Sequence, residues 1–181
     1  MRTLRHLLAA LLLIATTTAQ ADSWSYPPEV TTRAYSYGDV RVVTTTDARV
    51  HRKVPDFLLE IFRGETRVAQ IPGLSFEQLF VSNDNRLFLG LSNNGIPGTA
   101  VVLFNDRGDL LLLADHGMAE FDYCEKSVTL VRTWFDAANP NVRFRLGEEE
   151  AKPGIYVRTC KGNDVEILDA VRKAYARAGS H

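Results

Sequence analysis

Few side chains in this sequence have the types and spacing that catalysis requires. Four histidines are present, and His116 directly follows Asp115, so a Ser92–His116–Asp115 grouping is the one candidate for nucleophilic chemistry. The chain has neither a GxSxG elbow nor an SxxK motif, and an aspartate adjacent to its histidine is poorly placed to orient that ring. We therefore expect no catalytic residues and a protein that is not an enzyme.

The residue types that bind metals are also poorly arranged. Asp84 lies between Asn83 and Asn85, as in the start of a calcium-binding loop, but the terminal glutamate of such a loop is missing. A hydrogen-bonded turn is the better interpretation. Neither cysteine has a second cysteine or a histidine at metal-binding spacing. We predict no metal site and no cofactor.

The N-terminus is typical of a secretory signal peptide. Two arginines precede an apolar run, Leu7–Ala15, and Ala19-Gln20-Ala21 has the small residues of a cleavage site. The apolar run is much shorter than the roughly 20 residues of a membrane-spanning helix. We expect residues 1–21 to be removed, and residues 22–181 to form one domain in the periplasm or outside the cell.

The chain has two cysteines, Cys124 and Cys160. An even number of cysteines in an exported protein predicts a disulfide bond, here between these two residues. Two buried free thiols are the alternative.

The middle of the chain has the pattern of strands separated by tight turns. Leu87, Leu89 and Leu91 alternate with other residues, which places them on one face of a strand. Asn, Asp and Gly residues between apolar runs predict the turns. Four strands within Phe76–Gly117 predict one antiparallel meander, and the continuous apolar run Leu110–Ala114 predicts a strand covered on both faces.

A hairpin pattern recurs along the chain. Its copies have turn glycines Gly64, Gly108 and Gly162, at intervals of roughly 40 to 55 residues, which is near the spacing of propeller blades. Strand-like sequence precedes the first and third copies, and the stretch before the third is "FDYCEKSVTLVRTWF".

The stretch Phe76–Gly117, "FEQLFVSNDNRLFLGLSNNGIPGTAVVLFNDRGDLLLLADHG", resembles an NHL- or YVTN-type β-propeller blade. The shared pattern is a series of strands joined by an Asp-Asn turn, a polar loop and an Asp-x-Gly turn. The resemblance implies an all-β, mainly antiparallel fold of two or three blade-like four-stranded meanders. A complete propeller has at least four blades, so we expect an open, partial propeller.

The C-terminal segment Asp169–Ala178 is rich in alanine and has apolar residues at helical spacing. Asp169 is a candidate N-cap and Gly179 a candidate C-cap. The start of this short helix, at Asp169 or already at Asp164, stays open. Such a helix would cover an otherwise exposed sheet edge.

The loop Ser92–Gly98 is longer than a hairpin needs and contains good turn formers. The propeller resemblance implies that it projects from the same face as the links Ile71–Leu74, His116–Met118 and Asp136–Pro153. It places the tight turns, including that at Gly162, on the opposite face. Long loops on a rigid scaffold tend to carry function. The predicted partner-binding residues are Ser92, Asn93, Asn94, Gly95, Ile96, Pro97, Leu74 and His116.

The apolar residues of the predicted strands are expected to form the core. The residues expected to be buried are Phe57, Leu59, Ile61, Leu87, Leu89, Leu91, Val102, Phe104, Leu111 and Leu113. The aromatic residues Phe121, Tyr123, Trp134 and Phe135 fit a core better than a binding platform.

Two classes of function fit these features. The first is an exported, non-enzymatic protein-binding domain of the cell envelope, such as an immunity or inhibitor protein that blocks a secreted effector enzyme with a long loop. The second is a small-ligand or glycan-binding β module, or an enzyme with an unrecognised site. The formal charge of −1 is nearly balanced, which argues against nucleic acid as a partner and against an anionic membrane surface as the main one. No segment after the predicted signal peptide is long and apolar enough to cross a membrane, so we expect no insertion after its cleavage.

Overall fold

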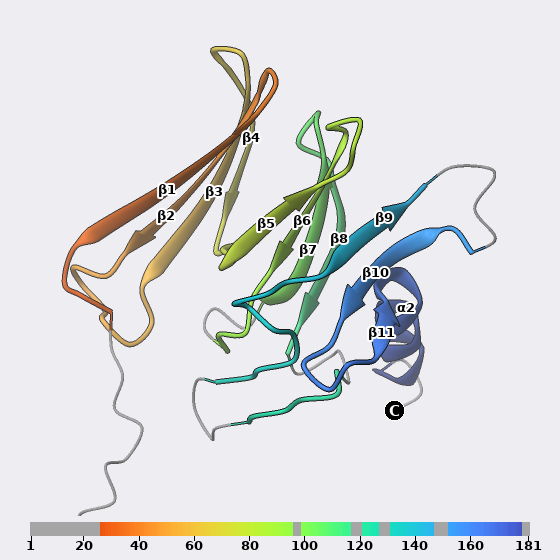
Figure 1. Ribbon diagram of the computed structural model, residues 1–181. Helices are drawn as coiled ribbons and strands as arrows, with labels where there is room; N and C mark the ends of the chain where they lie inside the picture. The colour runs from red at the N-terminus through yellow and green to blue at the C-terminus, as the bar shows by residue number, and fades with distance from the viewer. Residues whose placement is uncertain (1–25, 96–98, 117–120, 127–130, 147–151, 179–181) are drawn as a thin grey trace, which may run out of the picture.

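The computed structural model describes residues 26–95, 99–116, 121–126, 131–146 and 152–178. These residues form three antiparallel sheets and one helix (Figure 1). The predicted signal peptide and the proposed C-cap Gly179 lie outside the described residues. The predicted fold class is confirmed, because the chain is mainly antiparallel β-structure in three sheets of three or four strands with a short C-terminal helix.

Each of the first two sheets is a meander of four strands in chain order. The first contains β1 (Val30–Tyr37), β2 (Val40–Asp47), β3 (Asp56–Arg63) and β4 (Thr66–Pro72). The second contains β5 (Gln78–Val81), β6 (Leu87–Leu91), β7 (Thr99–Asn105) and β8 (Leu110–Asp115). This second sheet is the meander predicted from Phe76–Gly117.

The third sheet has three strands in the order β11-β10-β9 and leads into the helix. Its elements are β9 (Val142–Arg145), β10 (Gly154–Arg158), β11 (Asp164–Glu166) and α2 (Ile167–Ala178). Two sequence predictions are wrong here. The link Asp136–Pro153 contains β9. In the strand-like stretch 121–135, the described residues form isolated bridges at Val131 and Phe135 and no regular strand.

The three sheets stand side by side, with the second sheet in the middle (Figure 1). Its strands alternate so that successive side chains point to opposite faces, and both faces are covered. The side chains on one face, including Phe88 and Phe104, pack against Val42 and Ile61 of the first sheet. We call this cluster the first core; its rings Phe88 and Phe104 stack with centroids 5.4 Å apart.

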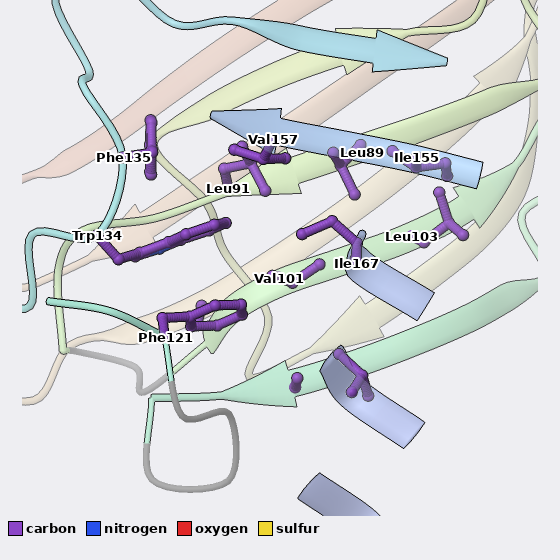
Figure 2. Packing of buried hydrophobic residues seen from close by; sticks show 13 residues of the cluster. Leu89, Leu91, Val101, Leu103, Phe121, Trp134, Phe135, Ile155, Val157 and Ile167 are labelled. Carbon is purple, nitrogen blue, oxygen red and sulfur yellow. The ribbon is translucent and has the colours of Figure 1, made fainter. Parts of the chain in front are cut away.

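The second core lies between the middle sheet, the third sheet and the helix, and Figure 2 shows its packing. Trp134 is fully buried at its centre. The ring of Trp134 stacks on Phe121 at 4.1 Å between centroids, and its Nε1–H donates to the carbonyl of Ser92 (3.0 Å). The prediction that Phe121, Trp134 and Phe135 belong to the core is confirmed.

The predicted disulfide is present between Cys124 and Cys160. It joins the segment that follows the second sheet to the turn between β10 and β11. The backbone N–H of Cys160 also donates to the carbonyl of Trp134 (2.9 Å). The irregular segment that carries Trp134 is therefore fastened to the third sheet by a covalent bond and by hydrogen bonds.

Most of the predicted core residues are buried, but two residues of β8 are not. Leu111 and Leu113 are 50% and 38% exposed, so the prediction that this strand is covered on both faces is wrong. β8 is the edge strand of its sheet. Leu112 and Ala114 face the second core, whereas Leu111 and Leu113 belong to neither core.

The helix begins at Ile167, between the two starts that the sequence left open. Glu166, not Asp169, caps it: the two carboxylate oxygens of Glu166 accept the N–H groups of Leu168 (3.2 Å) and Asp169 (2.6 Å). Ile167 is buried in the second core. The hydroxyl of Tyr175 donates to the carbonyl of Leu113 (3.0 Å), so the helix partly covers the β8 edge, as predicted. Among the described residues, no helix combines the length and hydrophobicity needed to cross a membrane.

The stacked sheets have two distinct ends. At the turn end, tight turns join β1 to β2, β3 to β4, β5 to β6 and β7 to β8, and Arg63 forms ion pairs with Asp39 and Asp106 across them. At the loop end lie the β2–β3, β4–β5 and β6–β7 connections (Figure 1).

The Gly162 turn lies at the loop end, which corrects the prediction that it shares a face with Gly64 and Gly108. The bridge between Phe135 and Thr159 holds it near Asn93, whose Nδ2 donates to the carbonyl of Phe135 (3.0 Å). The reason is strand parity. Gly162 follows the second strand of its sheet, whereas Gly64 and Gly108 follow the third, and successive antiparallel strands turn at opposite ends.

Candidate functional site

A cleft of about 470 Å³ opens between the first and second sheets at the loop end. We call it the intersheet cleft. Its walls come from β1, β2 and the β4–β5 and β6–β7 connections. Hydroxyl groups, aromatic rings and two charged side chains line it: Tyr26, Pro27, Thr31, Thr32, Arg33, Thr44, Thr46, Phe57, Ser75, Phe76, Glu77, Ser92 and Asn94.

The cleft exists because the inward face of β2 changes character along the strand. Val40 and Val42 point into the first core, and the next residues on the same face, Thr44 and Thr46, line the cleft. Threonine is β-branched and suits a strand as well as valine does. The strand therefore continues without interruption, while the surface that it presents changes from apolar to hydrogen-bonding.

Phe76 and Gly90 position the opposite wall. A side chain at Gly90 would place its Cβ within 2.5 Å of the Phe76 ring, so glycine allows the ring to lie directly on β6. Phe76 is buried in the first core. The backbone N–H of the next residue, Glu77, donates to the carbonyl of Leu91 (3.0 Å). Glu77 is thereby fixed at the point where the core ends and the cleft begins.

Glu77 supplies the carboxylate of the cleft. Its Oε2 accepts the backbone N–H of Asn93 (2.8 Å), and the guanidinium of Arg33 donates to its backbone carbonyl (3.4 Å). Burial raises the pKa of Glu77 above its ordinary value, and this effect exceeds the opposing effects of the Asn93 N–H and Arg33. The carboxylate is thus held in a poorly solvated place.

Tyr26 forms the rim of the cleft. Its hydroxyl accepts a hydrogen bond from Nδ2 of Asn94 (3.1 Å), and its ring meets Phe57 edge-on at 6.0 Å between centroids. Burial raises the pKa of the Tyr26 hydroxyl. The aromatic pair joins the segment before β1 to the start of β3.

The predicted binding loop is tied into the interior at its start. Ser92 is 2% exposed, and its Oγ donates to the carbonyl of Asn94 (3.2 Å). The Ser92 hydroxyl is therefore largely shielded from solvent. Oδ1 of Asn93 accepts the backbone N–H of Trp134 (3.0 Å), so this amide fastens the loop to the second core. Ser92 and Asn94 still line the intersheet cleft.

The other predicted site residues have different positions. Leu74 is buried in the first core, and His116 is buried beside Tyr123. Neither side chain is therefore exposed at the surface of the loop end. Gly95 is half-buried and lines a groove, described next. Ile96 and Pro97 lie outside the described residues.

A shallower groove of about 480 Å³ adjoins the intersheet cleft, and both contain Phe57. Its lining is mostly apolar and includes Val54, Pro72 and Gly95. Beside it the β2–β3 loop exposes Val50 by 78% and Val54 by 67%, more than any other large apolar residue among the described residues. The loop end thus combines a polar cleft with an exposed apolar loop.

Sequence reasoning missed these residues of β2 and of the β2–β3 loop. One signal was present: the run "VVTTTD" continues a strand pattern while its side chains change from apolar to hydroxyl. A second was the pair of valines at positions 50 and 54 in an otherwise charged loop.

Among the described residues, no group of three or more histidine, cysteine, aspartate or glutamate side chains is placed to hold a metal ion.

His116 makes the fold sensitive to pH. Its Nδ1 lies 3.3 Å from the Tyr123 hydroxyl, which donates to the His116 carbonyl (2.9 Å). Burial, with a smaller contribution from Arg132, lowers the pKa of His116 to about 4. Because this folded-state pKa lies below the ordinary value, the unfolded chain takes up the proton first as the pH falls. The folded state therefore has its full stability above the ordinary pKa of about 6.5 and loses stability as the pH falls towards 4.

We expect protonation of His116 to lower the free energy of unfolding by about 2 kcal/mol when the pH falls from 7 to 5. Urea unfolding of the wild type and His116→Gln at both pH values measures it, because glutamine cannot take up the proton. An equal pH dependence in the two proteins would contradict the assignment.

Comparison of the chain with protein-family models, curated proteins and solved structures found no match.

Proposed function

We propose that this chain is an exported binding protein of the cell envelope that engages another protein through its loop end and catalyses no reaction. The observation that carries the proposal is the combination of the intersheet cleft with the exposed Val50 and Val54 at the same end. A recessed polar cleft beside protruding apolar side chains offers a partner both a pocket and an apolar contact.

The chemistry of the cleft favours binding over catalysis. Among its described lining residues Glu77 is the one carboxylate, whereas glycoside hydrolysis, for example, uses a pair. The Cys124–Cys160 disulfide is compatible with an oxidising compartment outside the cytoplasm. A concrete version of the proposal is an immunity or inhibitor protein that covers the active site of a secreted effector enzyme.

The apolar loop provides the direct test. Val54→Asp places a charge where an apolar contact is expected, so we expect affinity for the partner to fall at least about tenfold, as at an interface hot spot. Folding stability should change by less than about 0.5 kcal/mol, because Val54 is solvent-exposed. The partner is first captured from an envelope extract, identified by mass spectrometry and then titrated by calorimetry.

Leu110→Asp is the matched control for this test. Leu110 is also an exposed large apolar residue, but it begins β8 at the turn end (Figure 1). Binding that is lost with Leu110→Asp and kept with Val54→Asp would contradict the proposed working end.

A small-ligand or glycan-binding role is the second candidate, and the hydroxyl groups of the cleft favour it. Thr31, Thr44, Thr46 and Ser75 line a volume of about 470 Å³, which falls within the usual range for small-molecule sites. In that case Val54→Asp would leave binding unchanged, and a sugar or another small polar molecule would bind in the cleft without a protein partner.

A further inference from the structure

We infer that the intersheet cleft receives a positively charged side chain, a lysine or an arginine, from the protein partner, and that Glu77 is its counter-ion. This inference rests on the proposed function, since it names the chemistry that the partner presents to the cleft.

The position of Glu77 is the first reason. Its carboxylate sits half-buried in the wall of the cleft, with Oε2 accepting the Asn93 N–H at 2.8 Å. A carboxylate that has lost part of its hydration is stabilised most by a charged donor that reaches it. The cation at the cleft, Arg33, is exposed and lowers the pKa of Glu77 less than burial raises it. Its hydrogen bond goes to the backbone carbonyl of Glu77 (3.4 Å), which leaves the carboxylate open to a second charged donor.

The hydroxyl groups that line the same cleft as the carboxylate are the second reason. Thr44 is buried, Thr46 is half-buried, and both face the cleft from β2. An ammonium has three N–H donors and a guanidinium has five, so one carboxylate cannot accept them all. The threonine hydroxyls that line the same cleft supply additional acceptors without adding charge.

The shape of the site is the third reason. A volume of about 470 Å³ accommodates one long side chain with the backbone that carries it, but it is small for a folded element. The apolar groove next to the cleft shares Phe57 with it. A partner segment with a basic residue flanked by apolar residues would therefore fill the cleft and the groove together.

The test uses small amides that carry a lysine or arginine side chain, so no partner protein is needed. Nα-acetyl-arginine amide and Nα-acetyl-lysine amide are titrated into the protein, and the amide signals of Thr44, Thr46 and Asn93 are followed by NMR. We expect saturable shifts at these residues with at least one of the two compounds, and none with Nα-acetyl-norleucine amide. The comparison of the two cations shows which of them the partner uses.

Two variants give effects of opposite sign. Glu77→Gln should weaken cation binding at least about tenfold, because the charge-assisted bond is lost. Arg33→Gln should strengthen it about threefold, since a like charge at the cleft is removed. Glu60→Gln is the control with no expected effect, because Glu60 pairs with Arg67 away from the cleft. Glutamine at position 77 keeps an oxygen for the Asn93 N–H, so the fold should persist.

The inference is overturned if neither cation shifts these signals, or if Glu77→Gln binds them as well as the wild type does. It is also overturned if Nα-acetyl-aspartate amide binds and Arg33→Gln abolishes that binding, which would assign the cleft to an anion. The titration needs no partner, so its failure is distinguishable from failure to capture a protein that depends on Val54.

Discussion

Replacing Trp134 with alanine is expected to destabilise the fold by about 3 to 5 kcal/mol, the range for removing a large buried aromatic side chain. Trp134 is fully buried between the sheets, stacked on Phe121, and hydrogen-bonded through Nε1 to Ser92. The change leaves a cavity in the second core and an unpaired carbonyl. Chemical denaturation followed by circular dichroism measures the loss.

Trp134→Phe separates the two contributions. It keeps most of the ring contact with Phe121 and removes the N–H donor, so a loss of about 1 to 3 kcal/mol is expected. If Trp134→Ala cost less than about 1 kcal/mol, the description of this residue as the centre of the second core would be wrong.

Asn93→Ala is expected to cost about 3 kcal/mol, although Asn93 lies in a loop. Its side chain donates to the carbonyl of Phe135 (3.0 Å) and accepts from the backbone N–H of Trp134 (3.0 Å). Alanine removes both bonds at once and leaves two backbone groups without these partners. Each such group costs about 1 to 3 kcal/mol when it is shielded from water.

Asn139→Ala is the matched control. Asn139 is exposed, and its backbone N–H, not its side chain, donates to the carboxylate of Asp136 (3.2 Å). We expect it to change stability by less than about 0.5 kcal/mol. Equal stability of Asn93→Ala and Asn139→Ala would show that the bonds of Asn93 contribute little.

These two predictions change how binding to the loop end is tested. Substitutions of Ser92 or Asn93 would disturb the link between the middle sheet and the Trp134 segment, so a loss of binding would have two explanations. Val54 and Glu77 reach the loop end from other segments, and exposed Val54 in particular has few contacts to lose. They are the better probes of a partner surface.

The local pattern of the sequence was sufficient for the strands of the middle sheet and for their turns. Leu87, Leu89 and Leu91 share a face because side chains alternate along any strand. The predicted turn glycines Gly64, Gly108 and Gly162 all adopt positive φ, which glycine does without steric cost. The disulfide followed from the number of cysteines and the expected compartment, without knowledge of the fold.

Only the tertiary structure decided which of these side chains are buried and which are exposed. Ser92 is polar and lies in a loop, but it is buried, and the indole of Trp134 donates a hydrogen bond to its carbonyl. Leu111 is apolar and lies in a strand, but the strand is at an edge and the side chain is exposed. Exposure depends on neighbours that are distant in sequence, and a local pattern contains no information about them.

The candidate site is the clearest case. By itself the sequence determined that Thr44 and Thr46 share a strand face and that Glu77 follows a large aromatic residue. Only the packing of the first sheet against the second brought these residues to one cleft with Tyr26 and Asn94. The physical reason is that the cleft is a gap between two sheets, and its walls are set by how the cores beneath them pack.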